Sequence, residues 1–121
     1  MTAPLFHITS KAEAQKAIER GEYEPQLFSV EGFIHCSYAH QATRVANLRF
    51  NGRRDLVLLQ IDRSKLPCEV IDENLEGGTE LFPHIYGRLP MSAVEKVHDF
   101  PCVETGKFDG IIDSWKQDFS S

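Results

Sequence analysis

The chain has 121 residues, of which 13 are Lys or Arg and 18 are Asp or Glu, so its formal net charge is −5 at pH 7. With 41% hydrophobic and 26% charged residues, its composition excludes wholesale disorder and collagen-like repeats. The mild acidity disfavours a large nucleic-acid interface and leaves small molecules as partners. We expect one domain that folds without disulfides or a structural metal.

The sequence predicts a cytoplasmic protein with reduced thiols. The first residues contain neither a basic segment nor a sustained apolar one, so no secretory signal is expected. The longest apolar run, Leu56 to Leu59, is far too short to cross a bilayer, and we expect no membrane partner. The cysteines, Cys36, Cys68 and Cys102, form an odd set without CxxC spacing, which favours reduced thiols over disulfides or a zinc ribbon.

A strand and a capped helix are predicted at the start of the chain. Residues 5–9 have the pattern of a short strand. Ser10 follows, with Glu13 three positions later, which is the capping-box pattern of a helix N-terminus. Gly21 can end this helix in a left-handed cap, so we expect the helix to run to about Arg20.

A loop that contains Tyr23 leads to a second strand and helix. Residues 33–37 are predicted to form the strand, and Ser37 is placed to cap a helix that runs through about Phe50. Residues 55–62 are apolar on both faces, which is typical of a strand covered on both sides. This segment is expected to be the central strand.

Three further strands are expected in the second half of the chain. Residues 69–73 could pair beside the central strand after a short turn. Residues 81–87 and residues 94–100 are the remaining strand candidates, with a turn between them. Pro83 favours an edge strand or an irregular start for the first of these two.

The fold expected from these elements is a single α+β domain over residues 1–100. It has a mixed twisted sheet of about five to six strands and about two helices. Residues 101–121 are polar and punctuated by glycine, so we expect a tail that packs on the domain or is partly flexible. Trp115 is the only large anchor in the second half of this tail.

Candidate site residues occupy alternating positions of the predicted strands. Phe33, His35 and Ser37 face one side of their strand, and Ile34 and Cys36 face the other. A polar site can therefore share a strand with the core. Because the cysteine thiol faces the core, it is not expected to react as a thiolate.

The same alternation groups His84 with Phe82 and Tyr86, and it groups His7 with Thr9. Three strand-borne histidines beside hydroxyls and aromatic rings suggest a cleft that hydrogen-bonds a polar, flat ligand. P-loop and GxGxxG patterns, the usual phosphate cradles, are absent.

Structural roles compete with this interpretation. Taken alone, His7 is more typical of a core or rim residue satisfied by a backbone carbonyl, whereas the flanking aromatic and hydroxyl groups of His35 and His84 favour a functional role. His40 and His98 have the pattern of ordinary surface residues. Three imidazoles and a water can also bind catalytic zinc, but no HxH or HExxH spacing occurs, so no metal is expected.

The sequence contains the motifs LFHIT at 5–9, GEYEP at 21–25, EGFIHCS at 31–37, LVLLQID at 56–62 and LFPHIYGRLP at 81–90. Together they resemble the bacterial domain of unknown function family 952. The resemblance covers about residues 4–98, and its two histidine motifs are distinctive. That family is similar in fold to the ADP-ribosyltransferase superfamily, which includes RNA 2′-phosphotransferases and DNA-modifying toxins. The resemblance implies an ADP-ribosyltransferase-like fold and NAD as a substrate.

The superfamily likeness also implies roles for individual residues. In the superfamily a His or Arg on the first core strand binds the nicotinamide ribose, a second-strand residue supports the pocket, and a later Glu often serves catalysis. By this likeness His7 matches the first position, and His35 with Ser37 matches the second. Both Glu73 and Glu80 precede the FPHIYG segment and are available for the third.

We therefore expect a cleft that holds NAD or a related nucleotide and transfers its ADP-ribose. The alternative from another class is a non-catalytic ligand-binding or protein-interaction module whose histidines secure loops and sheet edges, and a third is a zinc-dependent hydrolase. The sequence leaves the oligomeric state open. The expected catalytic residues are His35, His84 and Glu73, and the expected nucleotide-binding residues are His7, Thr9, Tyr23, Phe33, Ser37 and Tyr86.

Overall fold

The computed structural model describes residues 3–25, 28–74 and 78–115. In these ranges the strands are β1 (Leu5–Ser10), β2 (Glu22–Tyr23), β3 (Ile34–His35), β4 (Leu56–Ile61), β5 (Val70–Glu73), β6 (Phe82–Ile85), β7 (Leu89–Pro90) and β8 (Val94–Asp99). The helices are α1 (Lys11–Arg20), α2 (Phe28–Glu31) and α3 (Ala39–Arg49), and the short 3-10 helices are η1 (Arg63–Lys65), η2 (Met91–Ala93) and η3 (Ile112–Trp115).

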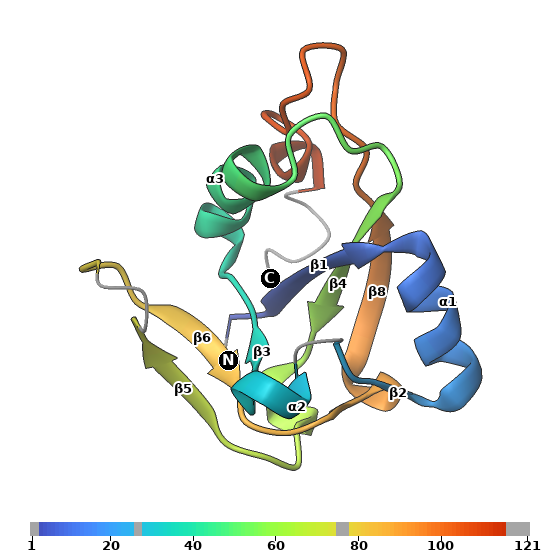
Figure 1. Cartoon of the computed structure of the whole chain (residues 1–121), viewed down its shortest axis with the longest axis vertical. Helices are drawn as coiled ribbons and strands as arrows, with labels where there is room; N and C mark the ends of the chain where they lie inside the picture. The colour runs from blue at the N-terminus through green and yellow to red at the C-terminus, as the bar shows by residue number, and fades with distance from the viewer. Residues whose placement is uncertain (1–2, 26–27, 75–77, 116–121) are drawn as a thin grey trace.

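The described strands form three small sheets with the orders β1-β4-β8, β2-β7 and β3-β6-β5 (Figure 1). All of these strand pairs are antiparallel. The expected α+β class and single domain are confirmed, whereas the single mixed sheet with two helices is wrong. None of the described helices has the length and apolar character needed to span a bilayer.

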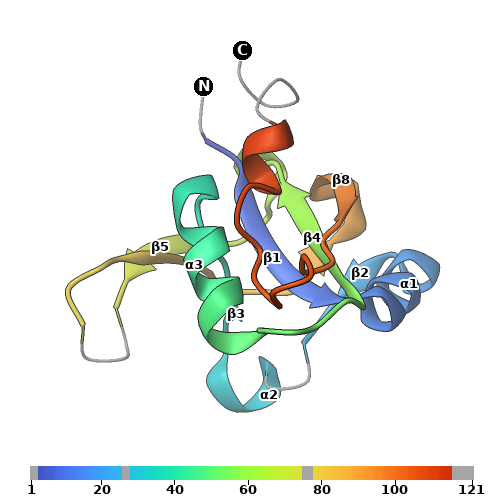
Figure 2. The ribbon, with the colours of Figure 1, turned by 90° about the horizontal axis from the view of Figure 1, so that it is seen from above.

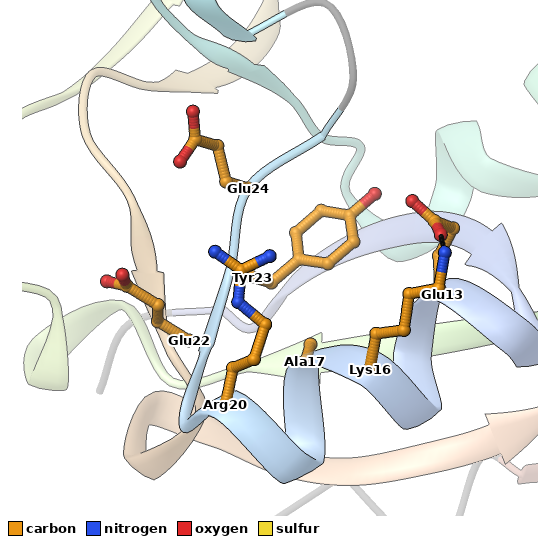
Figure 3. Close-up of a pocket in the computed structure, with 7 residues that line it drawn as sticks. All are labelled: Glu13, Lys16, Ala17, Arg20, Glu22, Tyr23 and Glu24. Atoms are coloured by element: carbon orange, nitrogen blue, oxygen red, sulfur yellow. Dashed lines mark ion pairs between the residues drawn. The ribbon is translucent and has the colours of Figure 1, made fainter.

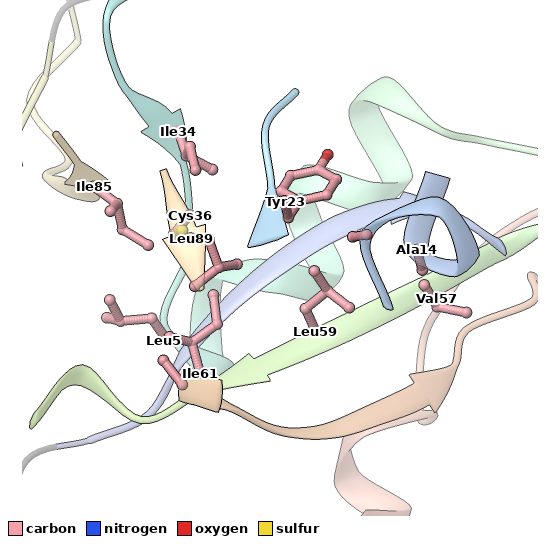
Figure 4. Packing of buried hydrophobic residues seen from close by; sticks show 12 residues of the cluster. Leu5, Ala14, Tyr23, Ile34, Cys36, Val57, Leu59, Ile61, Ile85 and Leu89 are labelled. Atoms are coloured by element: carbon pink, nitrogen blue, oxygen red, sulfur yellow. The ribbon is translucent and has the colours of Figure 1, made fainter. Parts of the chain in front are cut away.

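The strand β4 is the centre of the fold, as its sequence predicts. All six of its residues are buried, and it pairs with β1 on one edge and β8 on the other. Val57, Leu59 and Ile61 pack with the small residues of α1 in one core cluster (Figure 4). Leu56 and Leu58 pack in a second cluster with α3. The helices α1 and α3 therefore cover opposite faces of this sheet (Figure 2).

The predicted limits of the first helix are confirmed. The hydroxyl of Ser10 accepts a hydrogen bond of 3.1 Å from the backbone N–H of Glu13. At the other end Gly21 has a φ of 85°, a left-handed conformation that glycine adopts without steric cost, and its N–H donates to the carbonyl of Ala17.

The predicted start of the third helix is wrong by one residue. The N-cap of α3 is Tyr38, whose backbone N–H donates to the side-chain oxygen of Gln41. Ser37 instead exchanges two backbone hydrogen bonds of 2.8 Å with Phe6, so its main chain extends the strand. Of the strand expected over residues 33–37, only the two residues of β3 are in a ladder.

The strand β5 pairs with β6 and not with β4, because both edges of β4 are already occupied. β6 is consequently the middle strand of its sheet, so of the two alternatives for Pro83 the edge strand is wrong, and this residue is instead the second of β6. Proline is tolerated there because it lies beyond the two residue pairs of β3 with β6. Its carbonyl still accepts a hydrogen bond from the N–H of Cys36.

The segment after residue 100 contributes to the second core cluster. Phe108 is fully buried and stacks on Phe100 with ring centroids 4.8 Å apart. Cys102 and Ile112 are buried in the same cluster. This part of the expected tail packs on the domain, while residues 116–121 and the side chain of the expected anchor at position 115 lie outside the described part of the chain.

Candidate functional site

The sheet β3-β6-β5 brings two of the three predicted histidines together. His35 and His84 are direct partners in the β3–β6 ladder, and their ring centroids are 5.1 Å apart in an edge contact. Phe33 stacks on the ring of His84 at 4.4 Å and contacts the ring of His35 at 4.8 Å. As the alternation predicts, Ile34 and Cys36 point to the opposite side and are buried in the core.

Glu73 on β5 is the carboxylate of this cluster. Its Oε2 accepts a hydrogen bond of 2.9 Å from Nδ1 of His84 and another from the hydroxyl of Tyr86. The second candidate carboxylate, Glu80, instead accepts a hydrogen bond of 3.0 Å from the side-chain amide of Gln41 on α3. The two glutamates that the sequence left as alternatives therefore lie in different surroundings.

The hydrogen bonds to Glu73 favour its charged form. The hydroxyl of Tyr86 and then the imidazole of His84 hold the pKa of this carboxyl below its usual range. The same contact raises the pKa of Tyr86, because ionising the phenol would place two negative charges side by side. Both bonds use Oε2, and among the described residues Oε1 has no hydrogen-bond partner.

The ring of His84 is almost completely buried but keeps one nitrogen accessible. Its side chain is 5% exposed, and Nδ1 is bonded to Glu73. A carboxylate can only accept, so Nδ1 carries the hydrogen and Nε2 of the neutral ring carries a lone pair. Among the described residues Nε2 has no hydrogen-bond partner. Every fully buried side-chain nitrogen or oxygen of these residues does have one, so Nε2 is not fully buried and reaches the surface.

His7 lies behind this cluster, with both ring nitrogens engaged. Nδ1 donates to the main-chain carbonyl of His35 at 2.5 Å, and Nε2 lies 2.8 Å from the hydroxyl of Tyr23, which lies 3.1 Å from the hydroxyl of Thr9. Burial lowers the pKa of His7 from 6.5 to about 4, so the ring is neutral at pH 7. The three imidazoles thus form one pair, in which His35 is exposed and His84 is nearly buried, and one buried support.

Two contacts differ from what the sequence suggests. Glu31 on α2, which the sequence analysis did not single out, lies 3.2 Å from Nε2 of His35 through both carboxylate oxygens. The only sequence signal for this pair is a glutamate four positions before the histidine in EGFIH. His98 is not an ordinary surface residue, because its Nε2 lies 2.7 Å from the side-chain oxygen of the buried Gln60.

A shallow pocket lies between α1 and β2, away from the histidine pair. Charged side chains such as Glu13, Lys16 and Arg20 line it together with Tyr23 (Figure 3). Its volume of about 30 Å³ is enough for one or two water molecules. Of the predicted site residues it includes only the tyrosine.

Among the described ranges, no group of three or more His, Cys, Asp or Glu side chains is placed to hold a metal ion. None of the three cysteines is in a disulfide. Next to its aromatic rings, the histidine cluster offers a ligand three polar atoms: Nδ1 of His35, Nε2 of His84 and Oε1 of Glu73.

Residues 8–97 match the sequence pattern of a family described as "Protein of unknown function (DUF952)". The chain belongs to this family. The chain is similar to the crystal structure of protein CC0527 from Caulobacter crescentus, with 32% sequence identity and a TM-score of 0.77, covering 87% of this chain and 92% of that one. Its solution NMR structure has 28% identity and a TM-score of 0.78, covering 98% of both chains. No curated protein matches this DUF952 chain.

Proposed function

We propose that this DUF952 protein binds a nucleotide at the pair of His35 and His84 and transfers ADP-ribose from NAD. The observation that carries the proposal is the nearly buried ring of His84, which Glu73 fixes in one tautomer while its Nε2 reaches the surface. The likeness in fold between family 952 and the ADP-ribosyltransferase superfamily, which the sequence resemblance implies, supports the choice of NAD.

The proposed reaction uses one base and one carboxylate. The bond between the ribose C1′ and the nicotinamide nitrogen breaks, and nicotinamide leaves as a neutral molecule with the bonding electrons. A lone pair of the acceptor forms the new bond to C1′, and the acceptor's proton passes to Nε2 of His84. The ionised Glu73 stabilises the positive charge that develops on the ribose, for which its Oε1 is available.

The other expected site residues divide between contact and support. In this proposal the exposed ring of His35 hydrogen-bonds the ligand, and Phe33 and Tyr86 supply aromatic surface beside it. His7 supports β3 from behind through its hydrogen bond to the main-chain carbonyl of His35, and Tyr23 with Thr9 holds its other nitrogen. Ser37 is another of the expected pocket residues, and its main chain pairs with Phe6 and so joins the segment after β3 to β1. We place the protein in the cytoplasm, where its three unpaired thiols stay reduced.

The test is NAD binding by calorimetry and nicotinamide release by chromatography, with the full chain. We expect Glu73→Gln to lower the rate of release by about a hundredfold, the typical effect of removing one electrostatic group at a reaction centre. Glu80→Gln is the matched control, because this carboxylate bonds to Gln41 instead of the histidine cluster and its loss should leave the rate unchanged. The absence of binding at millimolar NAD would overturn the proposal.

A second candidate is a non-catalytic ligand-binding module on the same fold. It is favoured by His7, whose two nitrogens are both engaged within the protein, so that at least this histidine secures structure. This candidate predicts that NAD or a related nucleotide binds without release of nicotinamide. The same chromatographic experiment therefore separates the two candidates.

A further inference from the structure

We infer that Glu31 is a positioning residue that holds the imidazole of His35 in the orientation that a ligand meets. Both carboxylate oxygens lie 3.2 Å from Nε2 of this ring. The inference rests on the proposed function for the identity of the ligand. The orientation of the ring itself can be measured without any ligand.

The fold brings this carboxylate to the histidine through a glycine. Gly32 has a φ of 81°, a conformation that side chains other than glycine rarely adopt, and its N–H donates to the carbonyl of Phe28. α2 therefore ends immediately after Glu31, and the chain turns directly into β3. The carboxylate at the end of the helix and the imidazole on the strand consequently meet, although no continuous helix joins them.

His35 is held from several directions despite being exposed. Its main-chain carbonyl accepts the hydrogen bond from His7, and its backbone pairs with His84 in the ladder. The edge of its ring contacts the rings of Phe33 and His84 at 4.8 and 5.1 Å. An exposed ion pair alone is weak evidence of a role. Here the carboxylate is the contact that fixes the polar end of a side chain whose other parts are already constrained.

The two carboxylates leave unlike nitrogens accessible. Glu31 engages Nε2 of His35, so this ring presents Nδ1, whereas Glu73 engages Nδ1 of His84, so that ring presents Nε2. In the neutral rings both presented nitrogens are hydrogen-bond acceptors, because each carboxylate keeps the hydrogen on the nitrogen that it contacts. Such a pair fits a ligand group that donates hydrogen bonds, such as a hydroxyl or an amide. Loss of Glu31 would free one of the two acceptors to rotate.

The first test is the χ1 rotamer of the His35 side chain, measured by NMR as its Hα–Hβ couplings at pH 8. The wild-type chain should show one rotamer, and Glu31→Ala should show averaged couplings. Glu31→Gln should retain the single rotamer, because an amide oxygen also accepts from Nε2–H. Glu24→Ala is the matched control, since this carboxylate pairs with Arg88. A single rotamer in Glu31→Ala would overturn the inference.

The second test is NAD affinity by calorimetry. Holding one side chain in place is worth about a three- to tenfold change in affinity, which is the loss expected for Glu31→Ala and not for Glu31→Gln or Glu24→Ala. Averaged couplings with unchanged NAD affinity would overturn the positioning role. If the wild-type chain does not bind NAD but Glu31→Ala still averages the couplings, the positioning of His35 stands and the proposed function fails.

Discussion

The ring of His7 donates a hydrogen bond of 2.5 Å from Nδ1 to the main-chain carbonyl of His35. A buried imidazole on β1 thereby supports the strand that carries an exposed imidazole. Protonation of the supporting ring would add a hydrogen at Nε2, which faces the hydroxyl of Tyr23, and would leave the Nδ1 donor to the main chain in place.

His7 should make the protein less stable in mild acid. Its folded pKa of about 4 lies below the unfolded value of 6.5, so the unfolded chain binds the proton more readily between these values. The stabilisation is fully present above pH 6.5 and is lost as the pH falls towards 4. We expect the free energy of unfolding, measured with urea, to fall by about 2 kcal/mol between pH 7.5 and pH 5 from this group.

The matched variant for this experiment is His7→Gln, which lacks the titrating ring. This variant should be less stable at every pH, but its free energy of unfolding should fall less between pH 7.5 and pH 5. The difference from the wild-type chain should be the contribution of His7, about 2 kcal/mol. Equal pH dependence in the two proteins would show that His7 titrates normally.

Tyr86→Phe should raise the pKa of Glu73. The tyrosine hydroxyl is the largest cause of the lowered pKa of this carboxyl, and phenylalanine cannot donate the bond. A carboxyl with a lowered folded pKa contributes stability that is present above pH 4.5 and lost as the pH falls below it, so the variant should lose less stability on acidification than the wild-type chain. Titration of the carboxyl carbon by NMR measures the pKa directly. Tyr38→Phe, which removes a hydroxyl bonded to Asp72, should leave it unchanged.

His35→Ala should reduce ligand binding with little effect on stability. Its side chain is 44% exposed and its partner Glu31 is also partly exposed, so truncation strands no buried group. The cost in free energy of unfolding should be within about 1 kcal/mol, as for the exposed control His40→Ala. The free energy of unfolding is measured by thermal melting, and a decrease of about 2 kcal/mol or more in the His35→Ala variant would instead assign the ring a structural role.

The sequence predicts local features of this fold better than the pairing of its strands. The caps at Ser10 and Gly21 and the doubly buried β4 follow from short-range patterns, and all three are confirmed. The sheet partner of β5 depends on which edges of β4 remain open, which no local pattern records. The two-residue strands around Tyr23 and Leu89 are too short for alternation to indicate them.

The same limit applies to the candidate site. Alternation within one strand correctly groups Phe33 with His35, because the side-chain period of two is a local property. The choice between Glu73 and Glu80 requires the register of β5 on β6, which brings Glu73 against His84. The support from the buried imidazole of β1 depends on a contact between residues 28 positions apart in sequence.

Asn47→Ala should loosen the segment that follows β8. Its side-chain oxygen accepts from the backbone N–H of Phe108 at 2.8 Å, and its amide donates to Asp109. Truncation leaves that N–H without its partner, which costs about 1–3 kcal/mol in a buried setting. Urea unfolding measures the loss, and hydrogen exchange should quicken at the amide of residue 108. Leu48→Ala, at an exposed neighbouring position of the same helix, should change neither measurement.

The stacking of Phe108 on Phe100, in the cluster that also holds Phe6, has a consequence for biosynthesis. A nascent chain that has not yet been translated through residue 108 lacks the ring that packs on this side of β1 and β4 beside α3. Until then part of the apolar surface beside α3 is uncovered and accessible to chaperones and proteases. Translational stalling in the stretch between β8 and η3 should therefore yield degraded product and not a smaller folded domain.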